Sequence, residues 1–172
     1  MSSKNLKVIL LAGRGIKTIP TKTKTEILTS LDWLIHAFEE NDIYDITIIG
    51  GKDSNSFNNK FSKIKYIYNP LWEETGPLYS MFLAKDILYS SDCLVSYVDI
   101  VYRKDLVKDF INSLNSDLHI VTDLKWKQRY NGRTKKSFEK AEKVWLNSKN
   151  IVTNIAVEDH FKTKPSGEYA GL

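Results

Sequence analysis

Short continuous apolar runs alternate along the chain with longer stretches in which apolar residues follow a helical spacing. A continuous apolar run bounded by glycine is typical of a strand that is buried on both faces of a parallel sheet. Such runs predict strands over residues 6–12, 45–50, 64–68, 93–98 and 118–122. Apolar residues three and four positions apart predict helices over residues 27–40, 77–88 and 104–114, and a polar stretch ending at Phe61 is the remaining helical segment.

This order of elements predicts the fold class. Strands separated by helices four times over indicate stacked βαβ units, and therefore a three-layer α/β/α Rossmann-like domain with a mainly parallel, mixed sheet. After Asp123 the pattern changes, and residues 143–146 and 151–155 predict a C-terminal antiparallel hairpin at the edge or end of that sheet. We expect a single domain over residues 1–172, with a βα core in residues 1–123 and a further region in residues 124–172.

Composition excludes several classes of protein. Of 172 residues, 42% are hydrophobic and 27% are charged, which is typical of a soluble globular domain. Cys93 is the single cysteine, so an internal disulfide framework and a cysteine-rich zinc site are both excluded. The N-terminal apolar run, Val8 to Ala12, is far shorter than the roughly 20 residues of a membrane span. We therefore expect a cytoplasmic protein that does not bind a membrane.

Positive charge gathers between Lys125 and Lys143. This segment contains eight Lys or Arg residues and two acidic residues, whereas residues 1–99 contain 11 basic and 12 acidic residues. Such a segment attracts anions, and the aromatic residues within it make nucleic acid one candidate partner. A solvated surface loop is the alternative.

The loop after the first predicted strand has the features of a phosphate-binding turn. Gly13 and Gly15 let the backbone approach a ligand closely, so that several N–H groups can surround an anion. The segment lacks the P-loop pattern, and Thr18 stands where a dinucleotide fingerprint has its third glycine. An ordinary tight turn is the alternative interpretation of this loop.

The stretch LLAGRGIKTIPTKTK resembles the N-terminal signature of the nucleotidyltransferases of the glycosyltransferase-A-like fold, which is Ala-Gly-x-Gly-x-Arg followed by a Pro-Lys pair. Lys17 stands where that family has arginine, Lys24 takes the place of the motif's lysine, and Thr23 replaces the proline. The residues that this resemblance assigns to the nucleotide are Ala12, Gly13, Arg14 and Gly15.

Three further stretches extend the resemblance to the phosphocholine- and phosphonate-type cytidylyltransferases, over nearly the whole chain. NPLWEETGPLYSMFLAKDIL resembles their base-recognition loop and the following helix, which places Gly76 and Ser80 near the base. CLVSYVDIVY resembles the strand that ends in a Mg²⁺-binding aspartate, here Asp99. TDLKWKQRYNGRTKKSFEKAEKVWL and GEYAGL resemble the acceptor-side region, and the matching positions are Trp126, Tyr130, Arg133 and Glu142.

The resemblance implies a Mg²⁺-dependent enzyme that transfers CMP from CTP to a small phosphate- or phosphonate-bearing acceptor and releases pyrophosphate. Lys17, Lys24 and Asp99 would be the catalytic residues. Arg129 and Arg133, four residues apart, would hold the acceptor's phosphate. Relatives often form homodimers, which makes a homodimer one candidate state, although this sequence does not define the oligomeric state. They usually continue after GEYAGL with a strand, helices and a second metal-binding aspartate, so we expect either a shortened form or a variant with an altered site.

Two other functional classes stay open from the sequence. One is a catalytically inactive nucleotide-binding module of the same fold, and the other is a small basic protein that binds nucleic acid. Individual residues also have structural alternatives. Asp99 can cap the next element, and Ser80 can bond to the backbone of its own helix. Trp126 and Tyr130 can pack in a core, and Glu142 can form a structural ion pair.

Overall fold

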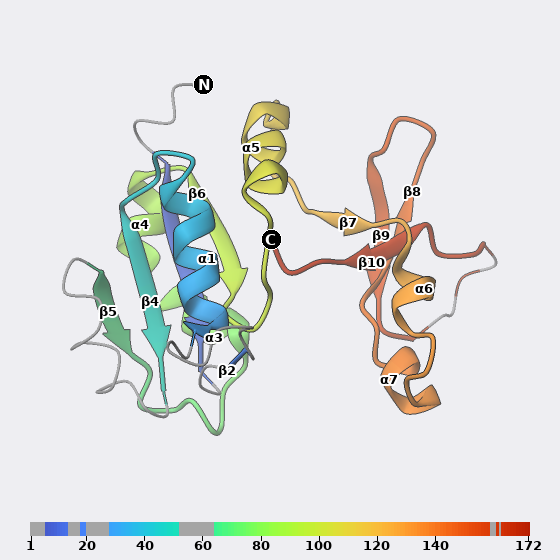
Figure 1. Cartoon of the computed structure of the whole chain (residues 1–172), viewed down its shortest axis with the longest axis horizontal. Coiled ribbons are helices and arrows are strands. Elements are labelled where there is room, and N and C mark those ends of the chain that lie inside the picture. Colours follow the sequence, from blue (N-terminus) through green and yellow to red (C-terminus); the bar gives the residue numbers. More distant parts are fainter. Residues whose placement is uncertain (1–5, 14–17, 20–27, 52–63, 159–160, 162) are drawn as a thin grey trace. The chain divides into compact units, whose positions relative to one another are not determined.

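The computed structural model describes residues 6–13, 18–19, 28–51, 64–158, 161 and 163–172. The chain forms two compact units, Met1–Ser116 and Asp117–Leu172 (Figure 1). The boundary therefore comes before residue 123, where the sequence pattern changes. Each unit has its own sheet, and the two are described in turn.

The first unit is built on a parallel sheet with the strand order β5-β4-β1-β6. The four strands are β1 (Lys7–Ala12), β4 (Ile46–Gly50), β5 (Lys65–Tyr68) and β6 (Cys93–Tyr97). All of their pairings are parallel, which confirms four of the predicted strands and the α/β fold class. A separate antiparallel pair is formed by β2 (Thr18–Ile19) and β3 (Leu28–Thr29).

Helices cover both faces of this sheet, as Figure 1 shows for α1 and α4. The helices of the first unit are α1 (Ser30–Glu39), α3 (Pro77–Phe82), α4 (Lys85–Ser90) and α5 (Lys104–Ser113). Ile9 and Ile49 pack on one face against Ala84 and the apolar side chains of α4. Val8 and Leu10, which alternate with Ile9, are fully buried on the opposite face.

The helix predicted over residues 77–88 is two short helices. Ala84 leaves the helical conformation, with φ −96° and ψ 25°, and serves as the N-cap of α4. Its side chain is buried against Ile9 and Ile49. The break therefore coincides with a residue that packs on the sheet, a tertiary contact that helical periodicity does not report.

Helix α1 begins at a capping box. The Thr29 hydroxyl accepts a hydrogen bond from the backbone N–H of Asp32, and the Asp32 carboxylate accepts one from the backbone N–H of Thr29. This reciprocal pair satisfies two N–H groups that have no partner inside the helix. The helix predicted from residue 27 thus begins later than expected, because Leu28–Thr29 forms β3 and Thr29 caps the helix. Ile27 itself and the polar stretch that ends at Phe61 lie outside the described residues.

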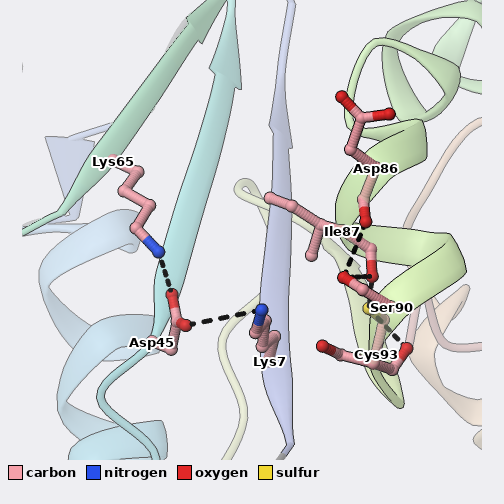
Figure 2. Close-up of polar contacts among 8 residues, drawn as sticks. Lys7, Asp45, Lys65, Asp86, Ile87, Ser90 and Cys93 are labelled. Atoms are coloured by element: carbon pink, nitrogen blue, oxygen red, sulfur yellow. Dashed lines mark hydrogen bonds and ion pairs between the residues drawn. The ribbon is translucent and has the colours of Figure 1, made fainter.

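Polar side chains at the amino edge of the parallel sheet form hydrogen bonds and ion pairs with neighbouring groups (Figure 2). Asp45 accepts a hydrogen bond from Lys65 at 3.0 Å, and its other carboxylate oxygen lies 3.9 Å from the ammonium of Lys7. The Cys93 thiol donates to the backbone oxygens of Ile87 and Ser91. Burial raises the pKa of this thiol, so it stays protonated and unreactive at neutral pH.

The second unit is built on an antiparallel sheet with the strand order β7-β10-β8-β9. Its elements are β7 (Thr122–Asp123), α6 (Trp126–Arg129), α7 (Lys135–Glu139), β8 (Lys143–Leu146), β9 (Val152–Ala156) and β10 (Gly167–Tyr169). The predicted hairpin is confirmed as β8 and β9. The side-chain oxygen of Asn147 closes its turn by accepting from the N–H groups of Lys149 and Ile151.

Two finer expectations about this region are wrong. The hairpin belongs to the second sheet rather than to the edge of the parallel one. The parallel strand expected at residues 118–122 does not form, and Thr122–Asp123 pairs antiparallel with β10 instead. The prediction of a strand here failed because the apolar run is not buried on both faces. The side chain of Leu118, for example, is 84% exposed. Across the described residues, no helix has the length and apolar character needed to span a membrane.

Candidate active site

The parallel sheet brings the carboxyl ends of its strands into one row. Tyr68, Gly50 and Ala12 are register partners on β5, β4 and β1. The residues one position further along these strands are Asn69, Gly51 and Gly13. Strand order changes direction between β1 and β6, because β4 and β5 extend to one side of β1 and β6 lies on the other. Ligands in open α/β sheets bind at such a switch point.

Asp99 follows β6 at this switch point. Tyr97 is the register partner of Leu11, and the backbone N–H of Val98 donates to the oxygen of Leu11 at 3.3 Å. Gly13 and Asp99 each lie two positions beyond this last pair, on neighbouring strands. Val98 is buried whereas Asp99 is exposed, so the carboxylate lies at the solvent side of the edge. Gly13 and Asp99 therefore lie at the same rim of the sheet, whereas Gly15, the other glycine of the predicted turn, lies outside the described residues.

The glycines of this edge fall into two kinds. At Gly13 and Gly76 an added Cβ would meet no atom of the described residues within 4 Å. Neither glycine has a positive φ, since the described glycines that do are Gly132 and Gly171. Other residue types can therefore adopt the backbone conformations of Gly13 and Gly76. Gly51 differs, because an added Cβ would overlap the side chain of Trp72. No described side chain therefore fills the space beside Gly13 or Gly76.

Other predicted nucleotide residues are placed as follows. Ala12 is buried at the end of β1, and Gly76 is the N-cap of α3 with φ −93° and ψ −179°. Ser80 is buried, and its hydroxyl accepts a hydrogen bond from the side-chain amide of Asn69 at 3.0 Å. Arg14, Gly15, Lys17 and Lys24 lie outside the described residues. Their predicted roles, like that of Asp99, stay predictions.

Three aromatic residues of the second unit form one cluster. Trp126 stacks on Phe138, with ring centroids 4.9 Å apart and planes 10° apart. Tyr130 meets both rings edge-on, at 6.0 Å from Trp126 and 5.4 Å from Phe138. Trp126 is only 2% exposed, so its ring contacts protein rather than solvent. The cluster fixes α6 and α7 against each other.

Charged side chains surround this cluster. The Tyr130 hydroxyl donates to the Glu168 carboxylate at 2.5 Å, and the Arg133 guanidinium lies over the Tyr130 ring at 5.4 Å. Burial, and then the hydrogen bond and negative charge of Glu168, raise the pKa of Tyr130 to about 12. Arg129 forms an ion pair with Asp123. Arg133 and Glu142 are exposed, and their substrate-binding roles stay predictions.

Sequence reasoning did not single out Glu168 or Asp123. They are direct register partners on β10 and β7, and Lys143 is the partner of Glu168 on β8. Directly opposed residues of an antiparallel pair share one face, so these three side chains form a polar row. The Lys143 ammonium is buried and donates to the backbone oxygens of Glu139, Ala141 and Val157. The quoted stretches TDLKWKQRYNGRTKKSFEKAEKVWL and GEYAGL contain these residues, but local spacing did not mark them out.

No protein-family model matches the sequence. The chain is 28% identical over 180 aligned positions to the CTP:phosphoglutamine cytidylyltransferase of Campylobacter jejuni subsp. jejuni serotype O:2, covering 96% of this chain and 70% of that protein. The resemblance to the nucleotidyltransferases is confirmed. The aligned region covers part of that relative's length rather than all of it.

Solved structures show the same fold. The inositol-1-phosphate CTP transferase from T. maritima aligns with a TM-score of 0.61 at 16% identity, over 96% of this chain and 68% of that one. The CTP:phosphocholine cytidylyltransferase from Streptococcus pneumoniae aligns with a TM-score of 0.58 at 19% identity, over the same shares of the two chains. The nucleotidyltransferase fold therefore includes the carboxyl edge described above.

Proposed function

We propose that this chain is a nucleotidyltransferase that transfers CMP from CTP to a small phosphate- or phosphonate-bearing acceptor and releases pyrophosphate. The observation that carries the proposal is the placement of Gly13 and Asp99 at the switch point of a sheet whose fold is that of the nucleotidyltransferases. The sequence similarity to a CTP-dependent cytidylyltransferase supports the choice of CTP.

In this reaction the main role of the protein is to position two polyanions. An oxygen of the acceptor's phosphate attacks the α-phosphorus of CTP, the bond from that phosphorus to the β-phosphate oxygen breaks, and pyrophosphate leaves with the bond's electrons. The open backbone at Gly13 would hold the triphosphate through its N–H groups. Holding donor and acceptor in line supplies most of the rate increase in such reactions.

Asp99 suits a magnesium ion. Mg²⁺ is commonly bound by one or two carboxylates together with substrate phosphates, and Asp99 is an exposed carboxylate at the predicted nucleotide edge. Among the described residues no cluster of three metal-binding side chains exists, so phosphate oxygens would complete the coordination. When bound, Mg²⁺ would neutralise charge that develops on the phosphates.

We propose that the acceptor's phosphate binds the basic residues of the second unit. Arg133 is exposed, and Arg129 can donate to a phosphate through the nitrogens that its Asp123 contact leaves, because a guanidinium has five N–H donors. Trp126, Tyr130 and Glu142 were expected to contact the rest of the acceptor. For Trp126 the buried position instead supports a role in shaping the site.

Pyrophosphate release tests the proposal. CTP, UTP, ATP and GTP would each be supplied with phosphoglutamine, phosphocholine, inositol 1-phosphate and an aminoalkylphosphonate, with and without Mg²⁺. We expect Mg²⁺-dependent release with CTP and at least one acceptor, and a CDP-linked product by mass spectrometry. CTP binding without release for any acceptor would favour the inactive module.

The nucleic-acid alternative needs aromatic faces on which bases can stack. Trp126 offers no such face, because it is buried and stacked on Phe138. Salt-sensitive binding of single-stranded DNA without Mg²⁺ would nevertheless contradict the enzyme proposal. The homodimer and the cytoplasmic location stay predictions, which light scattering and cell fractionation would check.

A further inference from the structure

The segment between β5 and α3 is held in place by one buried side chain. Asn69 is 0% exposed, and its backbone N–H donates to Gly50 at 2.8 Å. Its side-chain oxygen accepts from the backbone N–H of Leu71 at 2.9 Å. Its side-chain nitrogen donates to the hydroxyls of Thr75 at 3.1 Å and Ser80 at 3.0 Å. Both amide protons are therefore used, and a buried amide left without partners would be costly.

The direction of these hydrogen bonds is fixed. A backbone N–H cannot accept, so the oxygen of the Asn69 amide must face Leu71 and its nitrogen must face the two hydroxyls. The Thr75 hydroxyl donates its own proton to the Leu71 oxygen at 2.6 Å, so it can only accept from Asn69. The network accordingly has one arrangement of donors and acceptors.

Several large apolar side chains of this segment are exposed. Ser80 is the buried residue of α3, whereas Leu71, Leu78 and Tyr79 are between 41% and 63% exposed. The side chain of Trp72 packs against Gly51, and the bonds of Asn69 add fixed polar contacts at Leu71, Thr75 and Ser80. These bonds fix the chain on both sides of Gly76, at Thr75 before it and at Ser80 after it.

We propose that Asn69 is a positioning residue that sets the conformation of residues 71–80 for nucleotide binding, an inference that rests on the proposed nucleotidyltransferase function. The segment starts in the same row as Gly51 and Gly13, so its conformation determines what the carboxyl edge presents to a ligand. A loop that is ordered before binding loses less entropy when the ligand arrives. Asn69 thus acts on the nucleotide through Thr75, Gly76 and Ser80.

Four variants of the full chain test the inference by calorimetric titration with Mg²⁺–CTP. Asn69→Asp keeps the side-chain shape but removes both donors, and Thr75→Val removes one hydroxyl at constant shape. We expect Kd for CTP to rise about tenfold in the first and about fivefold in the second, since a buried hydrogen bond contributes on the order of 1 kcal/mol. Thr75→Ser, which keeps the hydroxyl, should bind CTP as the parent chain does.

Asn41→Asp is the matched control. Asn41 also donates two hydrogen bonds through its side-chain nitrogen, to Ala37 at 2.8 Å and Lys104 at 3.1 Å, but it follows the C-terminal end of α1. A purely structural effect would appear in this variant as well, whereas positioning predicts unchanged Kd for CTP. In turnover assays, Asn69→Asp and Thr75→Val should raise KM for CTP while kcat and KM for the acceptor stay within about twofold.

The outcomes separate this inference from the proposed function. Equal CTP affinity in the parent chain, Asn69→Asp and Thr75→Val would overturn the inference, and pyrophosphate release would then still support the function. Weakened CTP binding in these two variants, with no release for any acceptor, would support the inference and contradict the function. Equal weakening in Asn69→Asp and Asn41→Asp would also overturn the inference.

Discussion

The carboxyl edge of the first unit and the polar face of the second unit are built by different means. At the carboxyl edge, backbone groups and small residues dominate, as at Gly13 and Gly51, with Asn69 holding the adjoining segment. In the second unit, long side chains from different elements contact one another, as Tyr130 does with Glu168 and Arg129 with Asp123.

This difference indicates what each region can do. An edge of accessible backbone suits a triphosphate, because many N–H groups can share a spread negative charge. A face of long side chains suits discrimination among small acceptors, because each side chain can be replaced without a change of fold. We therefore expect changes at the carboxyl edge to affect the nucleotide, and changes in the second unit to affect stability or the acceptor.

The largest effect is expected at Asp99. Asp99→Asn removes the carboxylate proposed to hold Mg²⁺, and we expect kcat for pyrophosphate release to fall about a thousandfold, equivalent to about 4 kcal/mol. The control is Asp105→Asn, which removes an exposed carboxylate that pairs with Arg103. Its activity should match that of the parent chain. Unchanged release in Asp99→Asn would show that the metal is held elsewhere.

Trp126→Ala should act on stability. The ring is 2% exposed and stacked on Phe138, so its removal should lower the free energy of unfolding by about 3 kcal/mol. Denaturant titration measures this value, and Trp33→Ala, at a ring that is 43% exposed, should cost far less. Kd for CTP should not change at temperatures where the variant is folded. A lower CTP affinity in the Trp126→Ala variant would contradict the assignment of nucleotide binding to the carboxyl edge of the first unit.

Two glycines of the carboxyl edge should separate stability from binding. Gly51→Ala forces the Trp72 side chain to move, which should lower the free energy of unfolding by about 2 kcal/mol. Gly13→Ala meets open space, so stability should change by less than about 0.5 kcal/mol. Its methyl group would instead occupy the ligand's approach, and Kd for CTP should rise about tenfold. Thermal melts and calorimetry distinguish the pair, and equal behaviour would contradict the account.

The smallest effect is expected at Tyr130. Tyr130→Phe removes the hydrogen bond to Glu168 and should lower the free energy of unfolding by about 1 kcal/mol at neutral pH. The pKa of Tyr130 is raised from 10.0 to about 12, so its stabilising contribution is complete below pH 10 and is lost as the pH rises towards 12. The tyrosinate absorbance of the two proteins should differ by one group that titrates near pH 12. A difference that titrates near pH 10 would contradict the contact.

The sequence predicted the first unit better than the second. Strands β1, β4, β5 and β6 were found because a strand buried on both faces is a continuous apolar run. The break at Ala84 was missed because it depends on contact with Ile9 and Ile49. The run at residues 118–122 has the apolar pattern of a strand, but its pairing partner is β10, far along the chain.

The candidate site divides in the same way. Gly13 and Asp99 were identified because they follow apolar runs, and strand order then brings them to one edge. The row of Asp123, Glu168 and Lys143 depends on register between β7, β10 and β8, which local spacing does not encode. The strand over residues 64–68 was predicted, but the hydrogen bonds of the following Asn69 to Thr75 and Ser80 depend on how the segment folds back.

Hydrogen–deuterium exchange with and without Mg²⁺–CTP tests the central claim most directly. We predict that CTP protects backbone amides next to Gly13, Asn69 and Asp99, at the carboxyl edge of the parallel sheet. Amides at the opposite edge, beside Lys7 and Cys93, should exchange at the same rate in both conditions. Protection confined to that opposite edge or to residues 117–172 would contradict the proposed nucleotide site.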